Sequence, residues 1–164
     1  MKKLLFIATV GLILSCQQGP HPEFEANKAA AMKFMELQGS EADLNAQLEM
    51  FHEDALWQPA FHGSPQINKS QIGDYLKGWQ DAMDDVTFTA QNYLPGVSPE
   101  TGMADGSVRT YGKWTGTHTA TGKKWEVVSY HTWDFKDGKI IAGGDYLDAG
   151  GLLASLMQKE EMEE

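Results

Sequence analysis

The stretch from Asp105 to Met157 limits the possible folds most, because it predicts two long strands, a hairpin, a third strand and a capped helix in succession. In one of these strands every second residue belongs to an apolar and aromatic set with one serine and one histidine. The set consists of Trp125, Val127, Ser129, His131, Trp133 and Phe135. Alternate residues of a strand share one face, so the set forms a hydrophobic wall with a single titratable group. Such a wall is typical of a small-molecule pocket.

The rest of the chain predicts helices first and strands afterwards. We expect helices over 24–37, from Ser40 to about His52, and after the cap residue Asn68. A short edge strand or irregular extended segment is expected over 55–61. Further strands are expected over 86–94, 107–118, 124–135 and 140–146, with a tight turn at Asp137-Gly138, and a last helix over about 149–158. This order predicts an α+β domain with helices packed on one face of a curved antiparallel sheet.

The first 15 residues have the pattern of a secretion signal. Lys2 and Lys3 precede an apolar run that is shorter than the roughly 20 residues of a membrane-spanning helix. Ser15 followed by Cys16, the only cysteine, resembles the lipobox of bacterial lipoproteins, in which the cysteine is acylated. The alternative is an ordinary signal peptide with an incidental cysteine. We expect lipidation at Cys16, and Gln17 after it favours the outer membrane, with the domain facing the periplasm.

The predicted organisation is a signal peptide at 1–15, a tether at 16–23, one domain at 24–158 and an acidic tail at 159–164. The chain has 13 basic and 23 acidic side chains and a formal net charge of −10. A nucleic-acid partner is therefore not expected, since phosphate attracts positive charge. The acyl chains would be the link to the membrane, because anionic lipid repels an acidic protein. The sequence lacks a phosphate-binding glycine loop and a Gly-x-Ser-x-Gly elbow, so no cofactor is expected.

Three motifs together carry a resemblance to a known superfamily. They are Phe135-Lys136-Asp137-Gly138-Lys139-Ile140 with Tyr146-Leu147-Asp148, Trp114-Thr115-Gly116-Thr117-His118 with Thr121-Gly122-Lys123, and Phe51-His52-Glu53-Asp54-Ala55, which is similar to the end of a second helix. The chain resembles the nuclear transport factor 2-like superfamily, and its SnoaL-like branch most, over roughly 24–156. The resemblance implies a cone-shaped sheet with three N-terminal helices on its concave face and a short C-terminal helix. The superfamily hosts isomerases, cyclases, dehydratases and non-catalytic binders, so it implies a fold more than a function.

The resemblance also implies a catalytic pair. SnoaL-type polyketide cyclases place a histidine and an aspartate on neighbouring strands for proton transfer, and His131 and Asp145 match those positions. Asp145 would be the base, and His131 the acid or oxyanion partner. The alternative is a satisfied buried hydrogen bond that fixes strand register. A steroid-type isomerase is disfavoured, because the position of its catalytic aspartate falls at Gln58-Pro59.

The expected ligand is a small apolar molecule. Its expected pocket consists of Trp57, Trp79, Trp114, His118, Ser129 and Trp133, although a core position is the commoner role for each tryptophan. His118, His131 and Asp145 are residue types that bind zinc or iron, but no close-spaced histidine motif accompanies them and no metal is expected. Three functions remain open: a cofactor-free enzyme, a ligand binder, and an assembly module that dimerises through the outer sheet face with Val128 and Tyr130.

Overall fold

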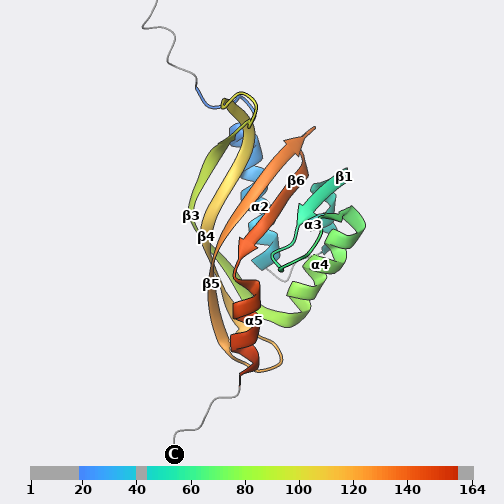
Figure 1. The fold of residues 1–164 in the computed structure, drawn as a ribbon, viewed down its shortest axis with the longest axis vertical. Helices are drawn as coiled ribbons and strands as arrows, with labels where there is room; N and C mark the ends of the chain where they lie inside the picture. The colour runs from blue at the N-terminus through green and yellow to red at the C-terminus, as the bar shows by residue number, and fades with distance from the viewer. Residues whose placement is uncertain (1–18, 40–43, 159–164) are drawn as a thin grey trace, which may run out of the picture.

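The computed structural model describes residues 19–39 and 44–158, which form four helices and one six-stranded sheet (Figure 1). In chain order the elements are α2 (Phe24–Gly39), α3 (Leu44–Glu49), β1 (Phe51–Gln58), β2 (Ile67–Asn68), α4 (Lys69–Ala82), β3 (Met83–Val97), β4 (Ala104–His118), β5 (Lys124–Lys136), β6 (Lys139–Leu147) and α5 (Ala149–Met157). None of these helices is long and apolar enough to cross a membrane. The α+β class expected from the sequence is confirmed.

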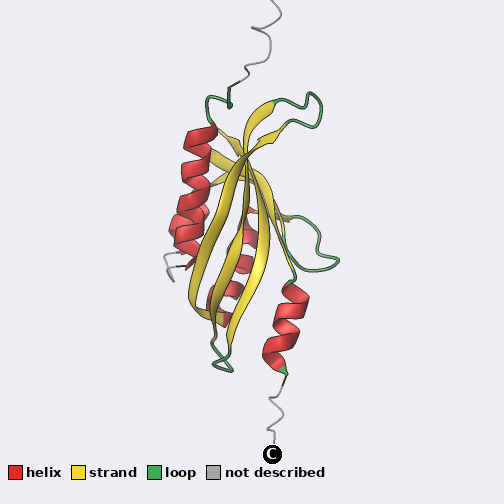
Figure 2. Cartoon of the chain, turned by 90° about the vertical axis from the view of Figure 1, so that its left-hand side faces the viewer, coloured by secondary structure: helices red, strands yellow, loops and turns green. Residues whose placement is uncertain are grey.

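The sheet is strongly curved and does not close on itself (Figure 2). Its strand order is β2-β1-β6-β5-β4-β3, and every neighbouring pair is antiparallel except β1 with β6. The long strands β3, β4 and β5 follow one another as hairpins, whereas β1 joins the sheet from an earlier part of the chain. The parallel pair therefore brings residues 51–58 beside residues 140–144.

The helix after Asn68 begins where the sequence predicts. The Asn68 side chain accepts a hydrogen bond from the backbone of Gln71, and the Gln71 side chain accepts one from the backbone of Asn68. This capping box satisfies two backbone N–H groups that have no partner inside the helix. Ile72 and Leu76 are buried on the face of α4 that meets the core, so this helix has an apolar stripe.

The expected helix from Ser40 to about His52 is wrong at its end. Helix α3 ends at Glu49, and β1 begins at Phe51, which pairs with Ile140 of β6. Phe51 is 1% exposed, so its burial against the sheet outweighs the helical pattern of the local sequence. The expected start of this helix, Ser40, lies outside the described residues.

Consequently, the motif taken for the end of a second helix forms most of a strand. Glu53 and Asp54 of this motif are exposed on β1, where Glu53 pairs with Lys69 at 2.7 Å. The extended segment expected over 55–61 begins earlier, at Phe51, and β2 covers part of its edge. Burial of apolar side chains on a pleated surface explains this difference, since it does not depend on helix propensity.

The later strands and their turn agree with the sequence. Asp137 and Gly138 both have positive φ angles, 52° and 73°, as the tight hairpin between β5 and β6 requires. On β5, Ser129, His131 and Trp133 are buried, while Val128 on the other face is 72% exposed. The expected alternation of β5 is therefore confirmed.

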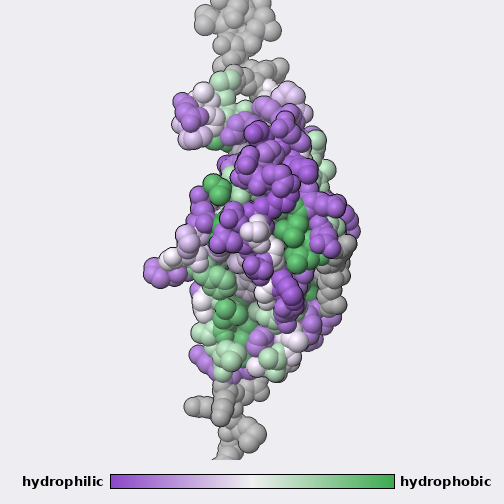
Figure 3. Space-filling view, turned by 90° about the vertical axis from the view of Figure 1, so that its right-hand side faces the viewer, coloured by the Kyte–Doolittle hydropathy of each residue, from purple (hydrophilic) through white to green (hydrophobic). Residues whose placement is uncertain are grey.

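One large core fills the space between the helices and the inner face of the sheet. Side chains of α2 and α4, among them Phe34 and Leu76, pack in it with Trp57 of β1 and Trp133 of β5. A smaller cluster joins Leu152 and other residues of α5 to the start of β3 and to β5. On the side of the molecule that carries α4 and β1, hydrophobic patches are separated by hydrophilic residues (Figure 3).

Candidate functional site

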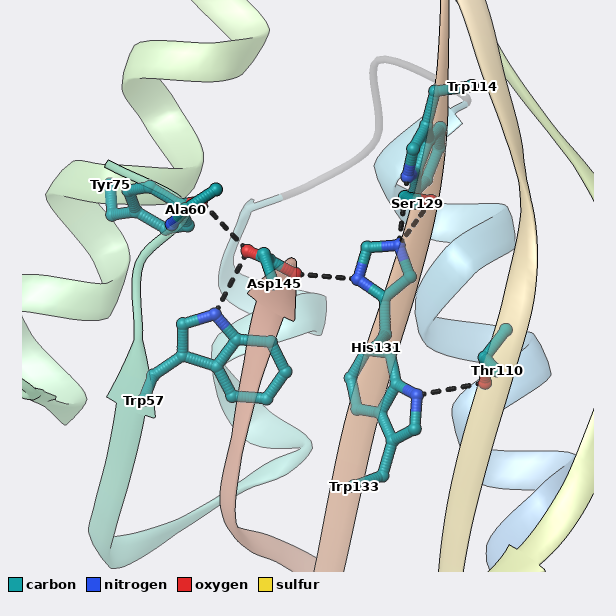
Figure 4. Close-up of polar contacts among 9 residues, drawn as sticks. All are labelled: Trp57, Ala60, Tyr75, Thr110, Trp114, Ser129, His131, Trp133 and Asp145. Carbon is teal, nitrogen blue, oxygen red and sulfur yellow. Dashed lines mark hydrogen bonds and ion pairs between the residues drawn. The ribbon is translucent and has the colours of Figure 1, made fainter. Parts of the chain in front are cut away.

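The two residues expected as a catalytic pair lie side by side. His131 of β5 and Asp145 of β6 are directly opposite each other in the antiparallel ladder. The His131 Nδ1 atom is 2.7 Å from the Asp145 Oδ1 atom, and both side chains are largely buried, at 3% and 16% exposed (Figure 4). The register of β5 and β6 therefore produces the contact that the resemblance implied.

The second oxygen of Asp145 is held by two further donors. Trp57 Nε1 of β1 donates to Asp145 Oδ2 at 3.0 Å, and the hydroxyl of Tyr75 in α4 donates to the same atom at 2.8 Å (Figure 4). Burial raises the pKa of the Tyr75 hydroxyl far above its ordinary value, and the negative charge of Asp145 raises it further. Tyr75 is thus a firmly protonated donor, and the carboxylate receives three hydrogen bonds from three different elements.

The other ring nitrogen of His131 is also occupied. Trp114 Nε1 lies 3.1 Å from His131 Nε2, and Ser129 Oγ lies 2.9 Å from it. An indole N–H can only donate, so His131 Nε2 must accept. The ring proton is therefore assigned to Nδ1, where it points at Asp145. His131 is a neutral donor to the carboxylate in this arrangement.

A glycine lets Trp57 reach Asp145. Gly143 pairs with Trp57 across the parallel β1 and β6 strands, and it lies two residues before Asp145. A Cβ atom added at Gly143 would lie 2.5 Å from Trp57 Cζ3 and 2.2 Å from the backbone oxygen of Thr132. The indole ring therefore packs onto the bare backbone of β6, and this close packing accompanies the Trp57 to Asp145 hydrogen bond.

All five tryptophans of the chain line one cavity next to this carboxylate. The centres of water molecules could occupy ≈ 70 Å³ of it. One water needs about 10–15 Å³ on this measure, so the cavity has room for several waters or one small organic molecule. Its walls are made by Phe34, Met35, Gln38, Trp57, Tyr75, Leu76, Trp79, Gln80, Met83, Val86, Trp114, Trp125, Val127, His131, Trp133, Asp145, Leu147 and Leu152. Asp145 is the only charged side chain among them, since His131 is neutral.

Most of the expected pocket residues reach this cavity, but two do not. Trp57, Trp79, Trp114 and Trp133 line it, together with both residues of the expected catalytic pair. Ser129 is not among the lining residues, but its hydroxyl contacts the Nε2 atom of His131, which is.

His118 was expected in the pocket and is elsewhere. It lies at the end of β4, opposite Met83, and its Nδ1 atom is 2.8 Å from Thr121 Oγ1 in the following turn. The alternation of β4 does point His118 inward. At this end of the strand, however, the side chain contacts the turn that follows β4 and does not reach the cavity. Among the described residues, no group of three or more His, Cys, Asp or Glu side chains is arranged to hold a metal ion. Cys16 lies outside the described residues.

The sequence did not single out Tyr75, Gln38 or Gln80 as site residues. Gln80 donates to Gln47 at 2.8 Å, and Gln47 donates to Gln38 at 2.7 Å, so these three amides form a neutral chain between α4, α3 and α2. Tyr75 carried one signal, because it is the position in the apolar stripe of α4 whose side chain ends in a hydroxyl. The glutamines lie on helices without a polar pattern, and only tertiary packing brings them together.

The arrangement can do two things chemically. A carboxylate at the wall of an apolar cavity can accept a proton from a molecule bound beside it, with Tyr75, Trp57 and His131 fixing its position. It can also attract and orient a ligand without reaction, since three donors already stabilise its charge. No N–H of His131 is free for a ligand, so the geometry gives this residue a positioning role.

The comparisons agree on the fold. The SnoaL-like domain model matches residues 32–143. A SnoaL-like polyketide cyclase candidate from Jannaschia sp. CCS1 is 12% identical, with 87% of this chain and 99% of that chain covered and a TM-score of 0.71. An isomerase candidate from Bacillus subtilis is 21% identical, with 82% and 96% covered and a TM-score of 0.66. BvnE pinacolase from Penicillium brevicompactum is 15% identical, with 80% and 92% covered and a TM-score of 0.63. These likenesses show a shared fold, and no curated protein matches the sequence.

Proposed function

The chain belongs to the SnoaL-like domain family, and we propose that it is a lipid-anchored envelope protein whose domain binds a small, mostly apolar molecule and transfers a proton on it. Asp145 is the general base of this proposal, and no cofactor takes part. The observation that carries it is the Asp145 carboxylate, which is the one charged side chain in a cavity lined by five tryptophans. The structural neighbours are described as a cyclase candidate, an isomerase candidate and a pinacolase, which supports chemistry of this general class.

The proposed step removes a proton from a carbon next to a carbonyl group. The Asp145 oxygen takes the proton, the electron pair moves to the carbonyl oxygen, and the proton is later returned at another atom. Isomerisation, aldol cyclisation and dehydration share this step. His131, which the sequence suggested as acid or oxyanion partner, orients the carboxylate in this proposal, because Asp145 and Trp114 already engage its ring nitrogens.

A non-catalytic binding domain is the second candidate. It is favoured by one observation, namely that three donors already satisfy the Asp145 carboxylate. Hydrogen bonds to the charged form make a carboxylate a weaker base. In this version the aromatic walls and the charge hold the ligand, and no proton moves.

A general probe of carboxylate bases separates the two candidates. A base removes the ring C–H proton of 5-nitrobenzisoxazole, the N–O bond breaks, and coloured 2-cyano-4-nitrophenolate forms. The rate is measured with the full chain carrying Cys16→Ser, which removes the expected acylation site. We expect the rate to fall at least about tenfold in Asp145→Asn, because general base catalysis contributes on the order of 10²–10⁴ in rate.

The matched control is Asp54→Asn, which removes the same charge from a side chain that is 80% exposed on β1. This variant should keep the full rate. Equal rates in Asp145→Asn and in the parent chain would exclude Asp145 as the base and favour the binding domain.

A further inference from the structure

We propose that the cavity selects a positively charged organic ligand, a small ammonium compound with apolar substituents, over a neutral molecule of the same shape. This proposal names the ligand class of the site described above, and it rests on the proposed function only in taking this cavity as the ligand site. It does not require that the bound molecule react.

The first argument is the charge balance of the cavity. Asp145 is 16% exposed, and its three hydrogen-bond partners are an indole N–H, a phenol hydroxyl and an imidazole N–H. Each of these donors is neutral, so none of them places a positive charge beside the carboxylate. Buried charges in proteins are normally paired with an opposite charge. No lysine or arginine lies among the residues that line this cavity.

His131 is the one lining residue that could balance the charge of Asp145. A second proton on the ring would make the histidine the missing cation. That proton would have to sit on Nε2, where the Trp114 N–H already donates from 3.1 Å. Two N–H groups cannot donate to each other, so the hydrogen bond from Trp114 stabilises the neutral ring. The remaining polar groups of the wall are also neutral, namely the amides of Gln38 and Gln80 and the indole N–H of Trp125.

The second argument is the aromatic lining. Aromatic rings attract cations through the negative charge of their faces, and aromatic boxes are the common binding site for quaternary ammonium groups. Tyr75 and Trp79 meet at 89° with their ring centroids 6.4 Å apart. The ring centroids of Trp57 on β1 and Trp133 on β5 lie 5.1 Å apart, with β6 between the two strands. A ligand in this cavity therefore lies among several rings and beside one carboxylate. The net charge of −10 also attracts cations towards the molecule.

Choline and 3,3-dimethylbutan-1-ol test the proposal, since they have the same shape and differ in one positive charge. Binding is followed by tryptophan fluorescence, which reports on this cavity because it contains every tryptophan of the chain. The full chain carrying Cys16→Ser is titrated with each compound at about 0.15 M salt, where charges on the surface are screened beyond about 8 Å. We expect choline to bind at least about tenfold more tightly than the alcohol.

Asp145→Asn should reduce this preference to about twofold or less, while Asp54→Asn, which removes an exposed charge, should leave it unchanged. Equal affinity of the two compounds, or tighter binding of the alcohol, would overturn the proposal. This comparison uses the parent chain, so it does not depend on how well the variant folds.

A chain that prefers choline but does not deprotonate 5-nitrobenzisoxazole would support the ligand class and reject the base. Deprotonation that depends on Asp145, without any preference for choline, would support the base and reject the ligand class.

Discussion

At the scale of the residue, Asp145 shows how a fold replaces water around a buried charge. Its donors come from β1, α4 and β5, which are far apart in the sequence. A hydrogen bond to a charged group contributes about 1.5–3 kcal/mol, and an unpaired buried carboxylate would cost more than this. The three donors therefore stabilise the fold and the position of the carboxylate at the same time.

Tyr75→Phe tests one of these bonds through the pH dependence of stability. The pKa of Tyr75 in the folded chain is raised above its ordinary value of 10.0, first by burial and then by Asp145. As pH rises, the unfolded chain loses this proton before the folded chain does. The contribution of Tyr75 to stability is therefore complete below about pH 10 and is lost above it, by up to about 1.4 kcal/mol per pH unit.

Urea unfolding at pH 8, 10 and 11 measures this effect. The parent chain should lose stability above pH 10 more steeply than Tyr75→Phe, which should be less stable by about 1.5–3 kcal/mol at pH 8. Tyr111→Phe, on the outer face of β4 and 39% exposed, is the control and should follow the parent chain. If the unfolding free energies of Tyr75→Phe and the parent chain changed in parallel with pH, the buried hydrogen bond from Tyr75 to Asp145 would be excluded.

At the scale of the element, β1 is the strand that the local sequence does not predict. It follows a short helix, carries charged residues, and still forms the single parallel pair of the described sheet. Phe51 and Trp57 bury their side chains in the core, and the pairing with β6 satisfies the backbone. The site depends on this strand, because β1 supplies Trp57 to Asp145.

Gly143→Ala tests how closely β1 packs on β6. The added methyl group would collide with the Trp57 ring and with a backbone oxygen, so we expect a loss of about 1–3 kcal/mol in unfolding free energy. Gly150→Ala in α5 is the matched control, since no atom lies within 4 Å of its added Cβ. That change should be neutral or stabilise by up to about 1 kcal/mol. Equal stability of the two variants in urea would argue against the packing of Trp57 on Gly143.

At the scale of the whole molecule, the curved sheet has two different faces. The inner face carries the cavity, whereas the outer face carries a row of tyrosines on three neighbouring strands, with ring centroids 4.7 Å apart for Tyr111 and Tyr130 and 5.5 Å for Tyr130 and Tyr146. Val128 lies on the same face and is 72% exposed. A homodimer through this face stays a prediction.

The proposed anchor is tested in a Gram-negative host that is given radioactive palmitate. The full chain should incorporate label and sediment with the outer membrane, because an acylated cysteine carries enough hydrocarbon to hold a domain at a bilayer. Cys16→Ser should lose both the label and the membrane association. Gln17→Asp should keep the label and move to the inner membrane. A parent chain without label would reject lipidation and favour an ordinary signal peptide.

The sequence by itself determined the elements whose signals are local. The cap at Asn68, the turn at Asp137-Gly138 and the alternation of β5 each depend on a few neighbouring residues, and the structure has them where they were expected. The tight hairpin alone does not place His131 opposite Asp145, because the register of β5 and β6 shifts by one residue between Asp134 and Phe135.

Tertiary structure alone decided the rest. It placed Phe51 in a strand, and it brought Tyr75, Trp57 and Trp114 to His131 and Asp145. The hydrogen bonds of Tyr75, Trp57 and Trp114 to these two residues join positions 17 to 88 apart in the chain, and no pattern within one element encodes them. Burial of apolar surface and satisfaction of buried polar groups act on the whole chain at once, which is why they overrule local propensity where the two disagree.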